Sequence, residues 1–194
     1  MNSRQFFEHL AQEWDDRQPA DRQVILDQLV SRVRHYLQDG GLLLEVGTGT
    51  GGLIPVLQKH FPKSMIISID FASAMLLRAQ KLNGCVVQVD VHHLSFPDRY
   101  FSSVICHNSF PHFKDKLHSL REIKRVLQPR GSLLIMHELS RERVNHIHQT
   151  ARAVEIHQDL LPPGDELAGW LLQAGFQPTI IEDAQDHYVA CARG

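Results

Sequence analysis

The sequence predicts an α/β fold built on a mostly parallel sheet, and three observations lead to that class. Short apolar runs alternate with helix-like patterns through the middle of the chain. The runs are near-continuous in leucine, isoleucine and valine, which is typical of strands buried on both faces. The last two runs are joined by only four residues, 183–186, and so tight a connection indicates an antiparallel pair. Repetition of strand and helix at this period predicts right-handed crossovers, with helices on both faces of the sheet.

The elements follow in order along the chain. Two helices are expected at residues 3–15 and 21–38, where apolar residues recur at helical spacing. A glycine pair at 40–41 stops the second helix. Five strands are then expected, at residues 42–46, 65–69, 86–89, 103–106 and 132–136. The helices between them are expected at residues 52–60, 72–82 and 115–127.

The last third of the chain has a different pattern. A polar helix that carries several histidines is expected over about residues 141–158, and it ends before the proline pair at 162–163. A short helix at 165–174 and strands at 177–182 and 187–192 complete the chain. Because neither a repeat nor a linker interrupts these elements, residues 1–194 are expected to form one domain.

Composition excludes several classes of function. Of the 194 residues, 43% are hydrophobic and 22% are charged, which suits a folded chain. The net charge is −2 and no basic block occurs, so a nucleic-acid partner is not expected. No apolar run reaches membrane-spanning length, and no membrane partner is expected. The three cysteines, Cys85, Cys106 and Cys191, lack metal-like spacing and indicate reduced thiols in a cytoplasmic protein.

A glycine-rich stretch after the first strand predicts a ligand site. Gly47, Gly49, Gly51 and Gly52 lie between that strand and the next helix. Glycine permits positive φ and close approach of a ligand, and the start of a helix offers free N–H groups. One reading is the dinucleotide pattern G-x-G-x-x-G, with Asp70 placed for a ribose. A tight turn without any ligand is the plain alternative.

A second reading of the same stretch is the pattern E-x-G-x-G-x-G, which begins at Glu45. That pattern resembles the first motif of the class I S-adenosylmethionine-dependent methyltransferases, and the resemblance covers about residues 35–194. LREIKRVLQPRGSLLI, residues 120–135, resembles their helix, turn and fifth strand, with Arg130 where a second glycine is common. The terminal hairpin, both strands of which look reversed, also favours this family over a nicotinamide-binding fold. The resemblance is to the small-molecule type, in the ubiquinone/menaquinone-methyltransferase-like group. It implies a Rossmann-like, mostly parallel seven-stranded sheet with a C-terminal antiparallel hairpin.

The resemblance implies S-adenosylmethionine as the cofactor. The glycine stretch would hold its methionine part, Asp70 its ribose hydroxyls, and Asp90 with Val91 its adenine. The expected cofactor-binding residues come from four segments of the chain: Glu45, Gly47, Thr48, Gly49, Gly51, Asp70, Phe71, Met75, Asp90, Val91 and His107.

A methyl acceptor is expected beyond the carboxyl ends of the fourth and fifth strands. His107 and His137 end those strands and are the candidate catalytic residues, with hydrogen-bonded structural histidines as the alternative. The expected acceptor pocket consists of polar residues near the same ends: Asn108, His112, Glu138, Arg141 and His148. Lid helices at 1–38 and a helical insertion at 138–164 are expected to cover it.

No metal is expected, because the histidines of the 141–158 helix are spaced on different faces or too far apart along it. A zinc site that includes His137 and His148 is the weaker alternative.

The expected function is therefore enzymatic: transfer of a methyl group from S-adenosylmethionine to a small-molecule acceptor by in-line displacement. Positioning of the reactants alone can lower such a barrier by roughly 7–11 kcal/mol. One alternative is a non-catalytic module that binds S-adenosylmethionine or S-adenosylhomocysteine, or a metal-linked sensor. An NAD-dependent oxidoreductase is a third and less favoured interpretation. The acceptor atom and the oligomeric state are left open by the sequence.

Overall fold

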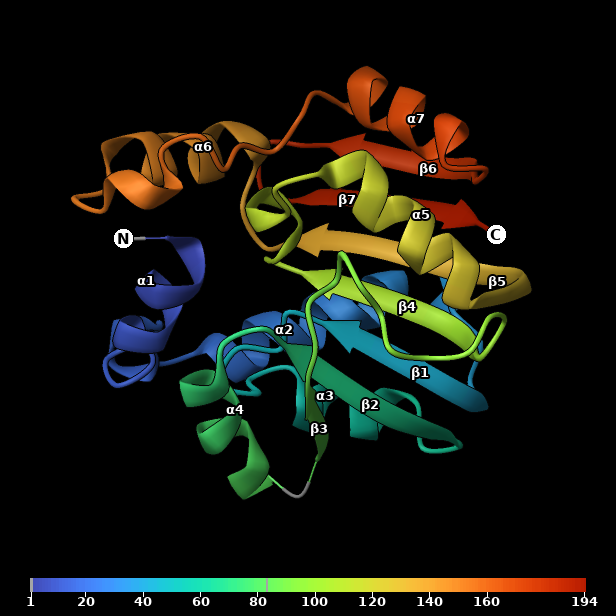
Figure 1. Ribbon diagram of the computed structural model, residues 1–194, viewed down its shortest axis with the longest axis horizontal. Coiled ribbons are helices and arrows are strands. Elements are labelled where there is room, and N and C mark those ends of the chain that lie inside the picture. The colour runs from blue at the N-terminus through green and yellow to red at the C-terminus, as the bar shows by residue number, and fades with distance from the viewer. Residues whose placement is uncertain (1, 83) are drawn as a thin grey trace.

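A seven-stranded sheet runs through the protein in the order β3-β2-β1-β4-β5-β7-β6 (Figure 1). The computed structural model describes residues 2–82 and 84–194. The strands are β1 (Gly41–Val46), β2 (Ser64–Asp70), β3 (Cys85–Gln88), β4 (Phe101–His107), β5 (Leu127–His137), β6 (Gln177–Asp183) and β7 (Tyr188–Arg193). The first five strands pair in parallel, and β7 is antiparallel to both of its neighbours. The mostly parallel sheet with a terminal antiparallel hairpin is confirmed. Only β7 is reversed, however, so the expectation that both terminal strands run backwards was wrong for β6.

The helices lie between and beyond the strands, close to the expected positions. They are α1 (Ser3–Leu10), α2 (Arg22–Val33), α3 (Ile54–His60), α4 (Ser73–Ala79), α5 (Lys116–Val126), α6 (Arg141–Thr150) and α7 (Gly164–Gln173). Short 3-10 turns are η1 (Asp15–Arg17), η2 (Arg34–Tyr36), η3 (Gln80–Leu82), η4 (Phe110–His112) and η5 (Val154–Ile156). None of the helices in the described ranges has the length and apolar character that a membrane crossing requires.

The helix expected over 141–158 ends early, at Thr150. Ala151 adopts an extended conformation with ψ 147°, which stops the helix. The chain then turns back, and the imidazole Nδ1 of His148 meets the backbone carbonyl of Asp159. This contact joins the end of α6 to the segment that follows it, so one long helix is replaced by a helix and a return.

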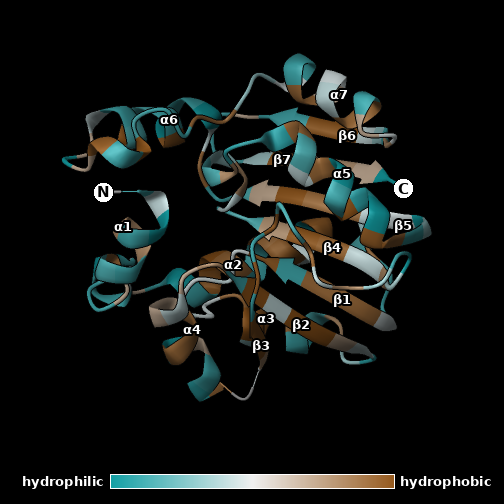
Figure 2. Ribbon diagram, viewed as in Figure 1, coloured by the Kyte–Doolittle hydropathy of each residue, from teal (hydrophilic) through white to brown (hydrophobic). Residues whose placement is uncertain are grey.

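Alternate residues of each buried strand supply two cores, one on each face of the sheet. Leu43 and Ile105 pack with α2 and α3, whereas Leu44 and Val104 pack with α5 and α7. This alternation is the two-residue period of a β-strand. In Figure 2 the hydrophobic colour runs along the sheet, and hydrophilic colour is prominent on the surrounding helices.

The first helix is attached to the edge of the fold beyond the carboxyl ends of the strands. Figure 1 places α1 and α6 there, on opposite sides of a gap. The carboxylate of Glu8 accepts hydrogen bonds of 2.7 Å from the backbone N–H groups of Ser73 and Ala74, at the start of α4. Phe7 of α1 packs with Met75 of α4. The helix is therefore held by both a cap and an apolar contact.

Candidate cofactor and acceptor site

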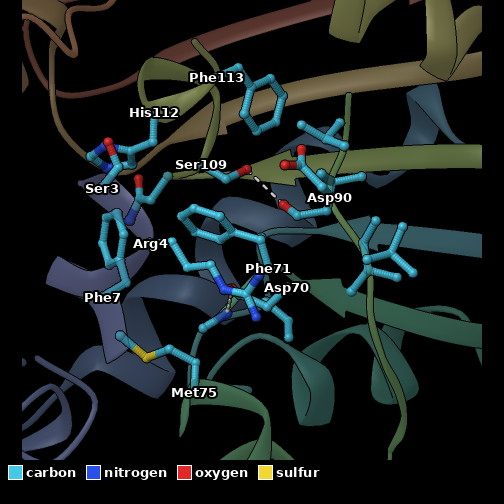
Figure 3. Close-up of a pocket in the computed structure, with 18 of the residues that line it drawn as sticks. Ser3, Arg4, Phe7, Asp70, Phe71, Met75, Asp90, Ser109, His112 and Phe113 are labelled. Carbon is cyan, nitrogen blue, oxygen red and sulfur yellow. Dashed lines mark hydrogen bonds between the residues drawn. The ribbon is translucent and has the colours of Figure 1, made fainter. Parts of the chain in front are cut away.

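A cavity of about 580 Å³ opens at the carboxyl ends of β1, β2 and β4. Its walls are the glycine loop after β1, the ends of β2 and β4, the loop after β3, η4 and the inner face of α1 (Figure 3). A parallel sheet presents such a hollow where neighbouring connections diverge to opposite faces. The site was expected at the carboxyl ends of the strands, and the structure has a cavity there.

The glycines of the loop have different surroundings: two line the cavity and one packs against the core. Gly47 and Gly49 line the cavity and have φ values of +76° and +57°. A Cβ on Gly47 would lie 2.3 Å from the Cβ of Ser109, so the loop passes directly against the end of β4. Gly51 does not line the cavity: a Cβ there would meet Ala79 at 3.0 Å. The loop leaves its backbone open to a ligand at the first two glycines, and it packs against the core at the third.

Glu45 lies behind the loop. Its side chain is buried, with 2% of the residue exposed, and it does not line the cavity. Its carboxylate accepts hydrogen bonds from the hydroxyls of Thr48 at 3.0 Å and Ser68 at 2.6 Å. Burial raises the pKa of Glu45, although the two hydroxyl bonds act against this. Glu45 and Gly51 were expected to bind the cofactor; the structure places both as supports of the loop, while Thr48 itself faces the cavity.

Asp70 connects the end of β2 to the glycine loop. One carboxylate oxygen, Oδ2, accepts from the N–H of Gly49 at 2.8 Å, and the other accepts from the N–H of Ala72 at 2.9 Å. Only 7% of the residue is exposed, and burial raises its pKa against these two bonds. Phe71 and Met75 line the cavity beside it. Each oxygen of the carboxylate retains acceptor capacity for a ligand hydroxyl.

Asp90 is held in place by a histidine that sequence reasoning missed. Its Oδ1 accepts from the backbone N–H of His92 at 2.9 Å and contacts the Nδ1 of the same residue at 2.6 Å. The N–H of Asp115 donates to the other ring nitrogen, Nε2, at 3.2 Å. A backbone N–H can only donate, so Nε2 accepts and the proton is assigned to Nδ1.

The two bonds from His92 also set the charge of Asp90. Partial burial raises the pKa of Asp90, but the bonds from His92 outweigh it and the net shift is downward. Within the described part of the chain, Oδ2 of Asp90 makes no hydrogen bond and is available to a ligand. Val91, the next residue, is buried and lines the same wall.

A carboxylate joins the ends of β4 and β5. Nε2 of His107 lies 2.8 Å from Oε2 of Glu138, and the side-chain amide of Asn108 donates to both oxygens of Glu138 at 2.9 and 2.8 Å. Burial raises the pKa of Glu138, but the neighbouring His107 and these hydrogen bonds outweigh it and hold the pKa well below its usual range. His107 and Asn108 line the cavity, and Glu138 braces them from the neighbouring strand.

His137 is turned away from the cavity that its neighbours serve. Successive residues of a strand point to opposite faces, so Glu138 and His137 diverge. His137 is 2% exposed, does not line the cavity, and packs edge-to-face on Tyr188 with ring centroids 6.2 Å apart. Its Nε2 has no hydrogen-bond partner among residues 2–82 and 84–194, and burial lowers the pKa of His137 to about 3. The structure thus places His137, expected to act on an acceptor, away from the cavity in which an acceptor would bind.

The remaining expected residues are divided between the cavity wall and its surroundings. His112 lines the cavity, and its Nδ1 lies 2.8 Å from Oδ2 of Asp159. His148 does not line the cavity; its ring lies 4.9 Å from the ring of His112. Arg141 pairs with Asp183 of β6 at 2.5 Å and also lies outside the cavity. The structure places His148 and Arg141 outside the cavity wall, and the chain turns back after α6 so that Asp159 stands behind His112.

No group of three or more histidine, cysteine or acidic side chains in the described ranges is arranged to hold a metal ion.

Arg22 of α2 lines the cavity, although it belongs to none of the sequence motifs described above. It lines the cavity near the glycine loop, and a Cβ on Gly52 would lie 2.7 Å from one of its guanidinium nitrogens. Its Nε is buried without a hydrogen-bond partner in the described ranges. Burial lowers the pKa of Arg22, and nearby acidic groups, among them Glu138 and Glu45, raise it. Arg22 lies 25 residues before Gly47 in the chain, so only the folded structure brings the two together.

Comparison of the sequence and structure with known proteins shows which proteins this chain is similar to. The model of a methyltransferase domain matches residues 44–135. Together with the relatives and solved structures below, this match supports a class I S-adenosylmethionine-dependent methyltransferase domain. The matched residues run from β1 through the glycine loop and β4 to β5, and S-adenosylmethionine is the cofactor of this family.

Individual relatives agree with the assignment. The chain is 35% identical to a demethylmenaquinone methyltransferase of Thermotoga maritima over 96 residues, which are 48% of this chain and 42% of the relative. It is 27% identical to a malonyl-[acyl-carrier protein] O-methyltransferase of Halorhodospira halophila over 191 residues, covering 92% of this chain and 62% of the relative. This methyltransferase chain thus spans about half the length of the curated relatives it matches.

Solved structures share the fold. A putative S-adenosyl-L-methionine-dependent methyltransferase of Methanococcus maripaludis superposes with a TM-score of 0.78 at 20% identity, over 99% of this chain and 95% of that one. A SAM-dependent methyltransferase of Aquifex aeolicus superposes with a TM-score of 0.73 at 20% identity, over 94% of this chain and 97% of that one. At this identity the agreement concerns the methyltransferase fold.

Proposed function

We propose that the protein, as one domain of residues 1–194, transfers a methyl group from S-adenosylmethionine to a small-molecule acceptor. The observation that carries the proposal is Asp70, which lines the cavity while it bonds to the glycine loop at Gly49. A carboxylate in that position suits a ribose diol beside an open backbone. The cavity volume of about 580 Å³ lies in the range of small-molecule sites.

The residues present fit the cofactor along its length. The open backbone at Gly47 and Gly49 would receive the methionine part, and Asp70 would receive the ribose hydroxyls. Asp90, through its available Oδ2, would receive the exocyclic amine of adenine. The apolar surroundings of the adenosine would come from side chains that line the same wall: Phe71, Met75 and Val91.

Arg22 adds a partner for the acidic end of the cofactor. The methionine part carries a carboxylate, and a guanidinium is the side chain that binds carboxylates most readily. Arg22 lines the cavity at the glycine loop and has a buried Nε without a partner among the residues described. We assign it the methionine carboxylate.

The bound cofactor supplies an electrophilic methyl group on sulfur, and the chain's own residues have to position the acceptor. His107 and Asn108 are fixed by Glu138 at the wall nearest the glycine loop. We propose that they contact the methionine part and the reacting atoms, because a fixed wall there sets the angle of approach.

The roof of the acceptor site is proposed to come from residues 1–38 and 138–164. Phe7 of α1 packs edge-to-face on His112 with ring centroids 4.9 Å apart, and Asp159 bonds to the same ring from the other segment. Both segments therefore meet at one cavity residue. Among the relatives, the demethylmenaquinone methyltransferases favour a small-molecule acceptor, whereas the malonyl-[acyl-carrier protein] O-methyltransferase is named for an acceptor carried by a protein.

The test is calorimetry followed by methyl transfer. We expect S-adenosylmethionine and S-adenosylhomocysteine to bind, NAD not to bind, and methyl-labelled cofactor to transfer its label to members of a small-molecule acceptor panel. Binding without transfer to any acceptor would favour the alternative of a non-catalytic S-adenosylmethionine module. Binding of NAD in place of S-adenosylmethionine would overturn the proposal.

A further inference from the structure

We propose that His112, oriented by Asp159, is the general base of the reaction, and that the acceptor is a compound with an aromatic hydroxyl group. This inference rests on the proposed function and specifies its acceptor side. The observation behind it is a histidine–carboxylate pair in which the histidine lines the cavity and the carboxylate stands behind it.

The hydrogen bond decides which ring nitrogen is free. Oδ2 of Asp159 lies 2.8 Å from Nδ1 of His112, and a carboxylate oxygen accepts. Nδ1 is therefore assigned the proton, and the neutral ring has its lone pair on Nε2. Nε2 of His112 makes no hydrogen bond to the described residues and is not among their buried unpartnered atoms. The basic nitrogen of the ring is thus the one left open to a ligand.

Both members of the pair are fixed before any acceptor arrives. The backbone N–H of His112 donates to the carbonyl of Ser109 at 3.0 Å, and Phe7 packs against the ring. The N–H of Asp159 donates to Ile156 at 3.0 Å, and its carbonyl meets Nδ1 of His148. Oriented bases of this kind are effective because the geometry of proton transfer is set in advance.

The pair lies on the side of the cavity where an acceptor would sit. In Figure 3, His112, Ser3 and Phe7 lie on one side, opposite Asp90 at the proposed adenine end. His107 also pairs with a carboxylate, but Glu138 binds Asn108 as well and this group lies beside Glu45 and the glycine loop. His107 therefore belongs to the cofactor side, and His112 faces the acceptor.

The charged and titratable groups that act on His112 or on its partner come from neighbouring elements. Asp159 faces it from the segment after η5, and His148 faces it from α6. Lys116, at the start of α5, acts electrostatically on Asp159, and the buried His137 lies within electrostatic range of His112. The side-chain exposure of His112 is 15%, so the ring can pass its proton on to solvent.

The proposed step balances as follows. The proton of the acceptor hydroxyl passes to Nε2 of His112 while the bond from oxygen to the methyl carbon forms and the carbon–sulfur bond breaks. The products are an aryl methyl ether and S-adenosylhomocysteine, and the imidazolium then releases its proton to water.

The acceptor class follows from the acidity of the hydroxyl group. A phenolic hydroxyl has a pKa of about 10, so it arrives protonated at neutral pH and gains from a positioned base. An alkyl alcohol is a far weaker acid, and a carboxylate arrives already ionised and needs no base. Phe7, Phe71 and Phe113 line the cavity and supply flat apolar surface for an aromatic ring.

Two measurements test the proposal, and the first needs no turnover. Long-range ¹H–¹⁵N spectra of the imidazole rings, with the His112 signal assigned from the His112→Gln variant, should show the proton on Nδ1. Asp159→Asn should change the tautomer of that ring, while His146→Gln, at an exposed position of α6, should leave it unchanged. A proton on Nε2 of His112 in the native protein would overturn the assignment.

The second measurement is kinetic and uses 2-naphthol, catechol and benzoate as acceptor probes with labelled S-adenosylmethionine. We expect transfer to the hydroxyl probes, a fall in kcat/KM of about 100-fold or more for His112→Gln, and loss of the acid limb of the pH profile. Asp159→Asn, a positioning variant, should lose about 10-fold. His107→Gln should keep the acid limb even if its rate falls.

Each other outcome has a defined meaning. Transfer to benzoate alone, or a cofactor that binds while no hydroxyl probe is methylated, refutes the aromatic-hydroxyl class. An acid limb that disappears with His107→Gln and survives in His112→Gln moves the base to His107. Absence of S-adenosylmethionine binding by calorimetry would instead remove the proposed function itself, so the two failures are distinguishable.

Discussion

Gly47 and Ser109 lie so close that a Cβ built on the glycine would be 2.3 Å from the Cβ of the serine. The hydroxyl of Ser109 donates to the carbonyl of Val46 at 2.6 Å, so the end of β1 and the chain after β4 are joined at this point. The same contact places the start of η4, and hence His112, relative to the glycine loop. One crowded glycine therefore links the cofactor side of the cavity to the acceptor side.

Gly47→Ala should be damaging for two reasons, the φ of +76° and the clash with Ser109. We expect a loss in the free energy of unfolding of about 2 kcal/mol or more, measured by urea denaturation, together with loss of cofactor binding. Gly49→Ala is the matched control, because its φ is also positive but its nearest new contact is Trp14 at 3.9 Å. If the two variants lose the same stability, the contact with Ser109 is not the cause. Ser109→Gly added to Gly47→Ala should recover part of the loss.

Asp70→Asn should weaken binding of S-adenosylhomocysteine by about 10-fold or more, because it removes a charged acceptor from the proposed ribose site. Asp70→Ala should also loosen the glycine loop, since Asp70 is 7% exposed and accepts from the N–H groups of Gly49 and Ala72. Calorimetry and urea denaturation of both variants separate the two effects. Asp90→Asn is the comparison, with a half-exposed side chain that should affect binding but not stability. Unchanged affinity in Asp70→Asn would remove Asp70 from the site.

Arg22→Gln should weaken the binding of S-adenosylhomocysteine by about 10-fold if the guanidinium holds the amino-acid carboxylate. The same variant should bind 5′-methylthioadenosine as the native protein does, because that nucleoside lacks the carboxylate. Calorimetry with the two ligands isolates the contact from any general loss of stability. Arg143→Gln, at an exposed position of α6, is the control. Equal weakening for both ligands would contradict the assignment.

His137 should make the protein sensitive to acid. Its pKa is about 3 in the folded protein, because burial disfavours the imidazolium, against about 6.5 for an unfolded histidine. The unfolded state therefore binds the proton first. The stability associated with the neutral ring is complete above pH 6.5 and falls as the pH drops toward 3, by up to about 1.4 kcal/mol per pH unit.

His137→Phe removes this titration and the unpartnered Nε2 while keeping a ring against Tyr188. We expect little change in unfolding free energy at pH 7.5 and greater stability than the native protein at pH 5, measured by urea denaturation. His146→Phe, at an exposed position, should leave the pH dependence as it is. A native and a His137→Phe protein with the same pH dependence would show that His137 is not buried as a neutral ring.

The fold was largely predictable because its signals are local. The strand–helix alternation, the glycine loop after β1 and the tight connection before β7 are each visible within a few residues. The main local error was the helix expected over 141–158, which ends at Thr150 because Ala151 becomes extended. Nothing in the polar pattern marks that break, since the contact of His148 with Asp159 that accompanies it is made across a turn of the chain.

Of the candidate site, only the residues at or just after the ends of the strands were predictable from the sequence. Asp70 ends β2, and Asp90 and the glycines come just after β3 and β1, so their position at the carboxyl edge follows from the strand pattern. The sequence by itself determined the class of the sheet, the place of the cavity and the family of the domain. Only the tertiary structure decided that His137 is buried while Glu138 braces His107. It also decided that Arg22 reaches the cavity, and that Asp159 bonds to His112, from distant segments. The physical reason is range: strand and turn preferences act between near neighbours in the chain, whereas the partners of a side chain depend on which segments meet after folding.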